Sequence, residues 1–121
     1  MTEDQLQQSI AIWFKNEYQM HGKGLIFSVP NGGSRNMLEA KKLKQTGAMA
    51  GVSDLIVLLN GKCLFVELKA EKGTQSEVQK IFEERVKNLN FDYFIIRSLE
   101  EFKKLTNQQR NIKNYDTITS D

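Results

Sequence analysis

Two apolar runs joined by Asn60-Gly61 constrain the fold of this chain more than any other feature. Leu55 to Leu59 and Lys62 to Leu68 are rich in Leu, Ile, Val and Phe. An Asn-Gly pair between such runs is the strongest short-range signal for a two-residue β-hairpin turn. The turn also fixes the register of the two strands, so the sequence predicts which side chains face each other.

The predicted register gathers charged side chains at one end of the hairpin. If Leu59 pairs with Lys62, Asp54 lies opposite Glu67, and the period of two puts Lys69 on the same face. Two unit charges about 5 Å apart repel by roughly 3 kcal/mol at an effective dielectric constant near 20. A divalent cation such as Mg²⁺, which proteins hold through one or two carboxylates and waters, would offset this repulsion. Two carboxylates solvated at the strand ends, with Lys69 as their salt-bridge partner, are the alternative, and a bulge would shift the register.

Both faces of the hairpin are apolar, so we expect helices on both sides of the sheet. One face carries Ile56, Leu58, Cys63 and Phe65, and the other carries Leu55, Val57, Leu59, Leu64, Val66 and Leu68. Asp54 and Glu67 would then lie at the rim of a buried sheet.

Length and composition favour one globular domain. The chain has 121 residues, 40% of them hydrophobic, and we predict a domain over residues 1–106 with a polar tail over 107–121. The net charge of +2 excludes a general coat for nucleic acid, so any basic surface is local. The single cysteine, Cys63, fits a reducing compartment, and with no signal peptide or apolar span the sequence predicts a cytoplasmic protein.

The remaining elements alternate between helix and strand. The order is helix, strand, helix, hairpin, helix, strand, helix, which predicts an α/β fold with a mixed sheet between helices. The expected elements are a helix from a Thr2–Gln5 capping box to about Met20, a strand over Leu25–Val29, a helix from about Ser34–Asn36 to Gln45 or Thr46, a helix capped by Thr74–Glu77 or Ser76–Gln79 and ending near Leu89, a strand over Phe91–Arg97, and a short helix from Ser98 through Leu105.

Two helical polar residues are candidates for the carboxylate site. Glu17 continues the apolar stripe of Leu6, Ile10 and Trp13, so this helix would either aim Glu17 at the hairpin carboxylates or leave it solvated beyond the buried part. Gln79 borders the stripe of the helix after the hairpin, which we expect to be Val78, Ile81, Phe82, Val86 and Leu89. Gln79 would either reach toward the sheet edge or be merely exposed.

A basic helix precedes the hairpin. Asn31 lies in a Pro-Asn-Gly-Gly turn, Arg35 follows it, and Lys41, Lys42 and Lys44 lie on the polar side of the next helix. This helix face is either simply solvated or tracks a phosphate backbone. The loop of small residues that follows, Gly47 to Gly51, would allow another backbone to approach Asp54 closely.

The order of these motifs resembles a known nuclease superfamily. Asp54, the hairpin and then Glu67-Leu68-Lys69 are similar to the Asp…Glu-x-Lys signature of PD-(D/E)XK nucleases. With Val29 to Arg35, Gly51 to Leu55 and Gln79 added, residues 6–104 resemble the VRR-NUC family in its small stand-alone form of phages and bacteria. Ser53 departs from that pattern, because the family commonly has proline before the aspartate.

The resemblance implies a restriction-endonuclease-like fold and a Mg²⁺- or Mn²⁺-dependent DNA endonuclease. The implied catalytic residues are Glu17, Asp54, Glu67, Lys69 and Gln79. The metal ligands would be Asp54, Glu67, Glu17 and the backbone carbonyl of Leu68, while Asn31, Arg35, Lys41, Lys42 and Lys44 would bind DNA. Stand-alone members look like Holliday-junction resolvases and tend to act as homodimers.

Two other functions stay open on the sequence. The chain could be a non-catalytic DNA-binding or scaffold module of the same fold, or a nuclease that acts on flaps or plain duplex in repair or restriction. The presence of every expected acidic and basic position argues against the first of these, because a degenerate site would have lost one.

Overall fold

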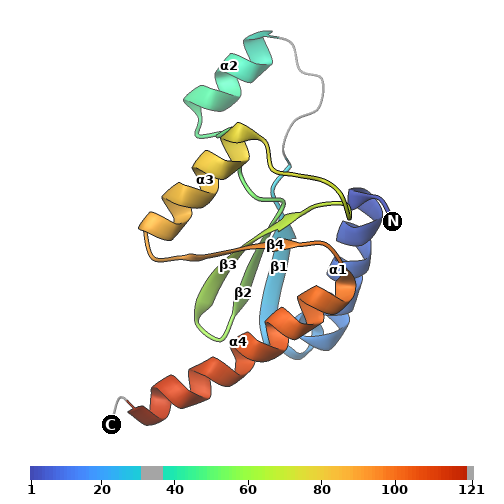
Figure 1. Cartoon of the computed structure of the whole chain (residues 1–121). Coiled ribbons are helices and arrows are strands. Elements are labelled where there is room, and N and C mark those ends of the chain that lie inside the picture. Colours follow the sequence, from blue (N-terminus) through green and yellow to red (C-terminus); the bar gives the residue numbers. More distant parts are fainter. Residues whose placement is uncertain (31–36, 120–121) are drawn as a thin grey trace.

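A four-stranded mixed sheet forms the centre of the molecule (Figure 1). The computed structural model describes residues 1–30 and 37–119. Its elements are α1 (Glu3–Glu17), the 3₁₀ turn η1 (Gln19–His21), β1 (Gly24–Ser28), α2 (Met37–Gln45), β2 (Leu55–Leu59), β3 (Lys62–Leu68), α3 (Glu77–Asn88), β4 (Asp92–Ile96) and α4 (Leu99–Thr119). The strands lie in the order β1-β2-β3-β4. The predicted α/β class and mixed sheet are confirmed.

The hairpin has the register that its turn predicts. Leu59 pairs with Lys62, and the antiparallel ladder runs to Leu55 opposite Val66. Asn60 and Gly61 have φ values of 54° and 74°, and a turn with two positive φ values matches the twist of antiparallel strands. Beside the hairpin, β1 pairs with β2 antiparallel and β4 pairs with β3 parallel, with α3 in the crossover.

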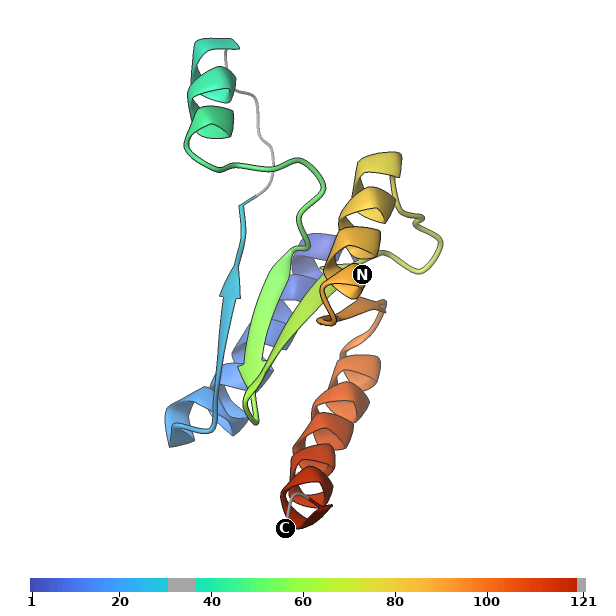
Figure 2. The same cartoon turned by 90° about the vertical axis from the view of Figure 1, so that its left-hand side faces the viewer.

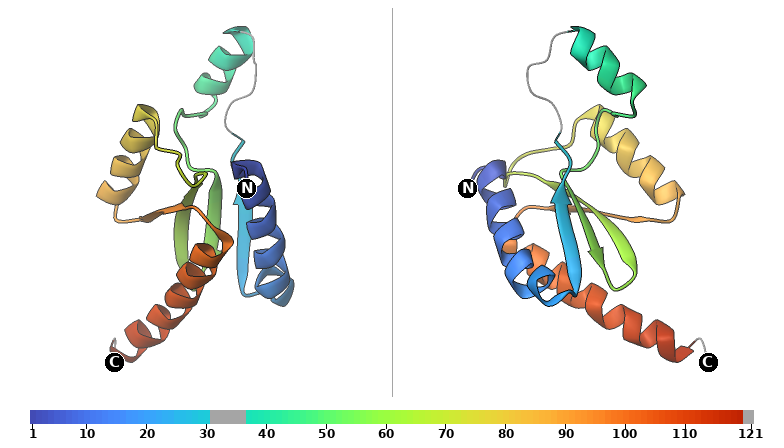
Figure 3. Two further views of the ribbon diagram at one scale, coloured as in Figure 1. Left: turned by 45° about the vertical axis from the view of Figure 1, so that its right-hand side comes forward. Right: turned by 180° about the vertical axis from the view of Figure 1, so that it is seen from behind.

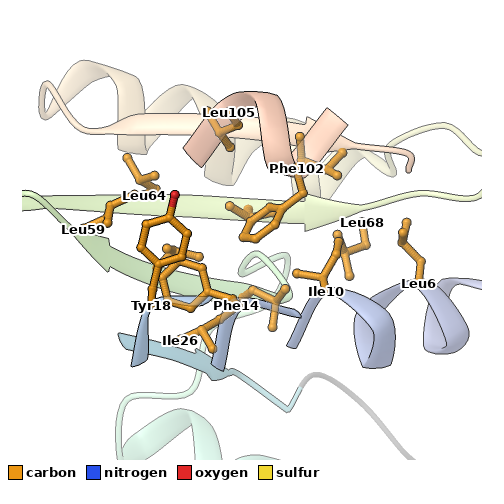
Figure 4. Close-up of a cluster of buried hydrophobic side chains, with 14 residues drawn as sticks. Leu6, Ile10, Phe14, Tyr18, Ile26, Leu59, Leu64, Leu68, Phe102 and Leu105 are labelled. Carbon is orange, nitrogen blue, oxygen red and sulfur yellow. The ribbon is translucent and has the colours of Figure 1, made fainter. Parts of the chain in front are cut away.

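The main core lies between one face of the sheet and the helices α1 and α4. In Figure 4, side chains from α1, the strands and α4 point toward one another. Phe14 and Trp13 of α1 both contact Phe102 of α4 edge to face, with ring centroids 6.0 Å apart in each case. The buried cluster is Leu6, Ile10, Phe14, Tyr18, Ile26, Leu55, Val57, Leu59, Leu64, Val66, Leu68, Ile96, Phe102 and Leu105.

The helix α3 covers the opposite face of the sheet, on the side away from α1 (Figure 3). The Phe82 ring packs on Phe65 of β3 at 5.8 Å and on Tyr93 of β4 at 6.2 Å. Val86 of the same helix is buried. These contacts place α3 over β3 and β4, on the same face of the sheet that carries Glu67.

Two expectations about this face are wrong. Val78, Ile81 and Leu89 belong to the predicted buried stripe of α3, yet they are 46%, 55% and 70% exposed. The second wrong expectation is that helices cover both faces of the whole sheet. On this face α3 lies over β3 and β4 only, so the same face of β1 and β2 has no helix of the described residues on it. Leu25, Phe27 and Leu58 are therefore exposed there.

The helix α2 stands away from the sheet (Figure 2). Within the described residues it packs on no other helix or strand. It ends at Gln45, and the Ala48 N–H returns to the Leu43 carbonyl at 2.8 Å while Gly47 adopts a φ of 108°. Gly47 therefore ends the helix as predicted, and the expected start near residues 34–36 lies outside the described residues.

The C-terminal helix is much longer than the sequence predicts. We expected a helix through Leu105 and a polar tail, but α4 continues to Thr119. The polar residues Thr106 and Gln109 are buried, and the Asn60 side chain donates to the Gln109 carbonyl at 3.1 Å. The hairpin turn thus contacts α4 at Gln109, beyond the predicted end of the helix.

The N-terminal helix begins as predicted. Thr2 and Gln5 form a reciprocal capping box, which fixes Glu3 and Asp4 in the first turn of α1. The helix ends at Glu17, earlier than the expected Met20. No helix in the described part of the chain is both long and apolar enough to cross a membrane.

Candidate active site

Asp54, Glu67 and Lys69 meet at one end of the hairpin. Asp54 immediately precedes β2, and the Leu68 N–H donates to its Oδ2 at 2.7 Å. The Asp54 carbonyl accepts from the Val29 N–H at 2.9 Å, so the backbone is held on both sides. Lys69 follows β3 directly and brings its Nζ within 4.0 Å of Glu67 Oε2. The predicted convergence of two carboxylates and an ammonium is therefore present.

Glu67 is fully buried, and its two oxygens have different surroundings. Oε1 accepts a hydrogen bond from the Tyr93 hydroxyl at 2.5 Å. Oε2 accepts no hydrogen bond from the described residues, and its ion-pair partner is the Lys69 ammonium. A buried carboxylate oxygen without a hydrogen bond is costly, which makes Oε2 the atom in this site that most needs a cationic ligand.

Burial acts on the protonation of both carboxylates. It raises the pKa of Asp54 above its ordinary value of 3.8; the Leu68 N–H opposes that rise, and the charge of Glu3 adds to it. Burial likewise raises the pKa of Glu67 above 4.5, against the opposing effects of Tyr93 and Lys69. In the folded protein without a cation, burial therefore disfavours the ionised forms of the Asp54 and Glu67 carboxyls.

We expect the metal-free protein to lose stability as the pH rises through the pKa values of these two carboxyls. Because each pKa is higher in the folded state, the folded state binds more protons once the pH exceeds about 4, and its free energy of unfolding falls with rising pH. Urea unfolding from pH 4 to pH 8 in a chelator would measure this fall. A double variant, Asp54→Asn with Glu67→Gln, lacks both carboxyls and should show a flatter profile; an equal slope in both proteins would contradict the prediction.

The residues present fit a hard divalent cation. Asp54 and Glu67 supply carboxylate oxygens, one of them buried without a hydrogen bond. No group of three or more His, Cys, Asp or Glu side chains is gathered closely enough to form a metal cage among the described residues. Two carboxylates completed by waters and substrate phosphates are the usual donor set of Mg²⁺, whereas zinc favours nitrogen and sulfur ligands.

Glu17 does not join this site, and the expectation that α1 aims it at Asp54 and Glu67 is wrong. It lies at the C-terminal end of α1, exposed, in a pocket of about 420 Å³ with Trp13, Lys103 and Arg110. The charges of Glu3 and Asp4 act on Asp54 instead. A helix of this length spans roughly 20 Å, and its N-terminal end lies at the end of the sheet where β2 begins and β3 ends (Figure 1).

The α1 carboxylates whose charges act on Asp54 are Glu3 and Asp4, which no sequence motif marked for this site. They lie outside the apolar stripe, in the first turn that the capping box defines. No sequence signal could have found them, because the direction of α1 is decided by the tertiary structure: its N-terminal end, and not its C-terminal end, meets the end of the sheet where β2 begins (Figure 1).

Gln79 lies in the first turn of α3, where its side-chain oxygen accepts from the Ser76 N–H at 2.8 Å. This oxygen is already used in capping the helix, and a catalytic role for Gln79 stays a prediction. Gly51 packs closely against the same turn: a Cβ on Gly51 would lie 2.3 Å from the Val78 carbonyl oxygen. The small-residue loop thus allows the close approach that the sequence predicts.

The candidate DNA-binding residues lie on or before α2. Lys41, Lys42 and Lys44 are exposed. Asn31 and Arg35 lie outside the described residues, and their predicted roles stay predictions.

Two further polar groups that no sequence motif marked are linked to Glu67, Tyr93 directly and Gln75 through Tyr93. Tyr93 comes from β4 and Gln75 from the turn before α3, and Gln75 Nε2 lies 3.4 Å from the Tyr93 hydroxyl. That turn is held by Arg97, whose guanidinium donates to the carbonyls of Ala70, Glu71 and Gly73. The parallel pairing of β4 with β3 brings Tyr93 beside Glu67, and no short-range pattern encodes that pairing.

The fold is similar to that of solved proteins with VRR_NUC domains. One structure, named "VRR_NUC domain protein", superposes with a TM-score of 0.69 at 21% identity and covers 89% of this chain and 87% of that one. A second, named "VRR_NUC domain", has a TM-score of 0.57 at 24% identity and covers 87% of this chain and 95% of that one. No protein-family model matches the sequence, and no curated protein matches it. The chain therefore shares the fold of VRR_NUC domains along nearly its whole length.

Proposed function

We propose that this chain, which has the fold of VRR_NUC domain proteins, is a divalent-metal-dependent DNA endonuclease that hydrolyses phosphodiester bonds. The observation that carries the proposal is Glu67 Oε2, buried without a hydrogen bond beside Lys69. An Asp–Glu pair with an adjacent lysine has the chemistry that phosphodiester hydrolysis needs. The names of the two similar structures and the sequence motif support the same reaction.

Each side chain has a role in this reaction that follows from its surroundings. Asp54 and Glu67, with the Leu68 carbonyl, would hold Mg²⁺ or Mn²⁺, and the α1 carboxylates whose charges act on Asp54 are Glu3 and Asp4 rather than Glu17. When bound, the cation would lower the pKa of a water and neutralise charge on the phosphate. Lys69 would orient the attacking water or stabilise the developing charge. Gln79 would position a phosphate oxygen through its side-chain nitrogen.

The exposed lysines of α2 would bind the phosphate backbone. Replacing Lys41, Lys42 and Lys44 by alanine should weaken DNA binding at all sequences and reduce the slope of log K against log salt by roughly 2 to 3, because each neutralised phosphate releases a counterion. Fluorescence anisotropy over a salt series measures the slope. A matched variant with alanine at the exposed Lys15, Lys23 and Lys104 should keep the wild-type slope, and equal slopes in both variants would contradict a role for α2.

Branched DNA, and four-way junctions in particular, is the substrate that we propose. A resolvase makes paired cuts, which requires two active sites and therefore a homodimer. The exposed apolar side chains on β1 and β2 are consistent with a protein that associates. A strictly monomeric mass in solution, both with and without DNA, would count against dimerisation.

A cleavage assay tests the function directly. The wild-type protein is incubated with a four-way junction, a flap and a linear duplex of equal length, each with Mg²⁺, Mn²⁺ or a chelator. We expect cleavage only with metal and fastest on the junction. Preference for the flap or duplex would favour a different nuclease, and binding without cleavage under every condition would favour a non-catalytic DNA-binding module.

A further inference from the structure

A chain of hydrogen bonds connects α3 to the buried carboxylate Glu67. At its outer end, Lys87 Nζ pairs with Glu83 Oε2 at 2.6 Å. The hydrogen bond from Lys87 lowers the pKa of Glu83, so Glu83 is ionised at neutral pH and only accepts hydrogen bonds. The outer end of the chain is therefore fixed as an acceptor.

Gln75 links this acceptor to the site. Its Nε2 donates to Glu83 Oε1 at 3.0 Å and lies 3.4 Å from the Tyr93 hydroxyl oxygen. An amide nitrogen has two hydrogens and accepts none, so Gln75 can serve both oxygens at once. The Tyr93 oxygen then acts as an acceptor toward Gln75.

With its oxygen accepting from Gln75, the Tyr93 hydroxyl has its one proton left for Glu67. It donates this proton to Glu67 Oε1 at 2.5 Å. A tyrosine hydroxyl has an ordinary pKa of about 10 and is protonated at neutral pH, so it has this proton to donate. The hydrogen bonds from Lys87 to Glu67 thus run in one consistent direction.

We propose that Tyr93 is a positioning residue that makes Glu67 a one-oxygen metal ligand, by engaging Oε1 and leaving Oε2 toward Lys69 and the cation. The inference rests on the proposed function, because it concerns the metal ligand of that same site. The inference also predicts that the site selects between divalent cations. Mg²⁺ and Mn²⁺ suit a single carboxylate oxygen in octahedral geometry, whereas Ca²⁺ readily binds both oxygens of one carboxylate. Tyr93 therefore favours the smaller cations over Ca²⁺.

Tyr93→Phe tests this inference because it removes the donor and keeps the ring that packs on Phe82. Calorimetric titration of the metal-free protein with Mn²⁺ and, separately, with Ca²⁺ measures the two affinities without any DNA or cleavage. We expect the Mn²⁺ affinity to fall about 10- to 100-fold, as for other losses of a residue that orients a ligand. The Ca²⁺ affinity should hold or rise, because Oε1 becomes available as a second oxygen.

Tyr18→Phe is the matched control. Tyr18 is also a buried tyrosine of the core, stacked on Phe14 with centroids 4.9 Å apart, but it lies at the end of the sheet away from Asp54. This variant should bind both metals as the wild type does. Gln75→Met, which removes the donor to Tyr93, should shift the ratio of the two affinities in the same direction by a smaller factor, and it tests the relay even if Tyr93→Phe folds poorly.

The possible outcomes separate this inference from the proposed function. If the wild type binds Mn²⁺ but Tyr93→Phe keeps the wild-type affinities, or loses both metals equally, the positioning role is overturned and the nuclease proposal stands. If the wild type binds no Mn²⁺ and cleaves no DNA, the proposed function fails and the inference fails with it.

Discussion

Glu67→Gln is expected to abolish metal-dependent cleavage, by a factor on the order of 10²–10³ or more. A neutral amide cannot balance the charge of a cation, and Oε2 is the carboxylate oxygen in this site that is buried without a hydrogen bond. The change keeps the size of the side chain and an oxygen that can accept from Tyr93. Single-turnover cleavage of a junction with Mn²⁺ measures the effect.

The same variant should fold at least as stably as the wild type when no metal is present. The substitution removes a buried charge that burial already disfavours. Urea unfolding in a chelator measures this, and it shows that lost activity does not come from lost folding. Glu77→Gln, at an exposed position of α3, is the matched control and should retain cleavage. Normal cleavage by Glu67→Gln would exclude Glu67 from the chemistry.

The second large effect is expected at Gly51. It has a φ of 83°, and an added Cβ would lie 2.3 Å from the Val78 carbonyl oxygen and 2.6 Å from its carbon. A left-handed residue with a Cβ costs about 1–2 kcal/mol, and overpacking adds about 1–3 kcal/mol. Gly51→Ala should therefore lower the free energy of unfolding by roughly 2–5 kcal/mol and also reduce cleavage. Activity falls because relief of the clash must move either the approach to Asp54 or the first turn of α3.

Gly61→Ala separates the two causes. Gly61 has a similar φ of 74°, but nothing lies within 4 Å of an added Cβ. It should lose only the backbone part, about 1–2 kcal/mol, and keep its cleavage because the hairpin turn is at the far end of the strands. Urea unfolding of both variants gives the comparison. Equal losses in the free energy of unfolding for Gly51→Ala and Gly61→Ala would mean that the close contact of Gly51 with α3 does not contribute to the effect.

Local chemistry determined the features that the sequence predicted correctly. The Asn60-Gly61 turn set the hairpin register, and that register put Asp54, Glu67 and Lys69 together. The capping boxes at Thr2 and Ser76 set the starts of α1 and α3 for the same reason, since a cap involves residues only three positions apart. Each of these depends on backbone geometry within a few residues.

Tertiary structure alone decided the rest. Periodicity gives the apolar stripe of a helix but not which end of the helix meets which end of a sheet, so it points to Glu17, whereas the α1 charges that act on Asp54 are those of Glu3 and Asp4. It also does not say how far a helix extends across a sheet, so the exposed Ile81 was expected in the core. The contact between α4 and the hairpin turn at Gln109 is likewise one that no stripe in the sequence shows.

In the carboxylate site too, some features follow from the sequence and others only from the tertiary structure. The sequence by itself determined its charged members, because a two-residue turn and a period of two fix their positions. Only the tertiary structure decided that Tyr93 engages one oxygen of Glu67, because that contact needs a parallel strand delivered by α3 from 26 residues further along the chain.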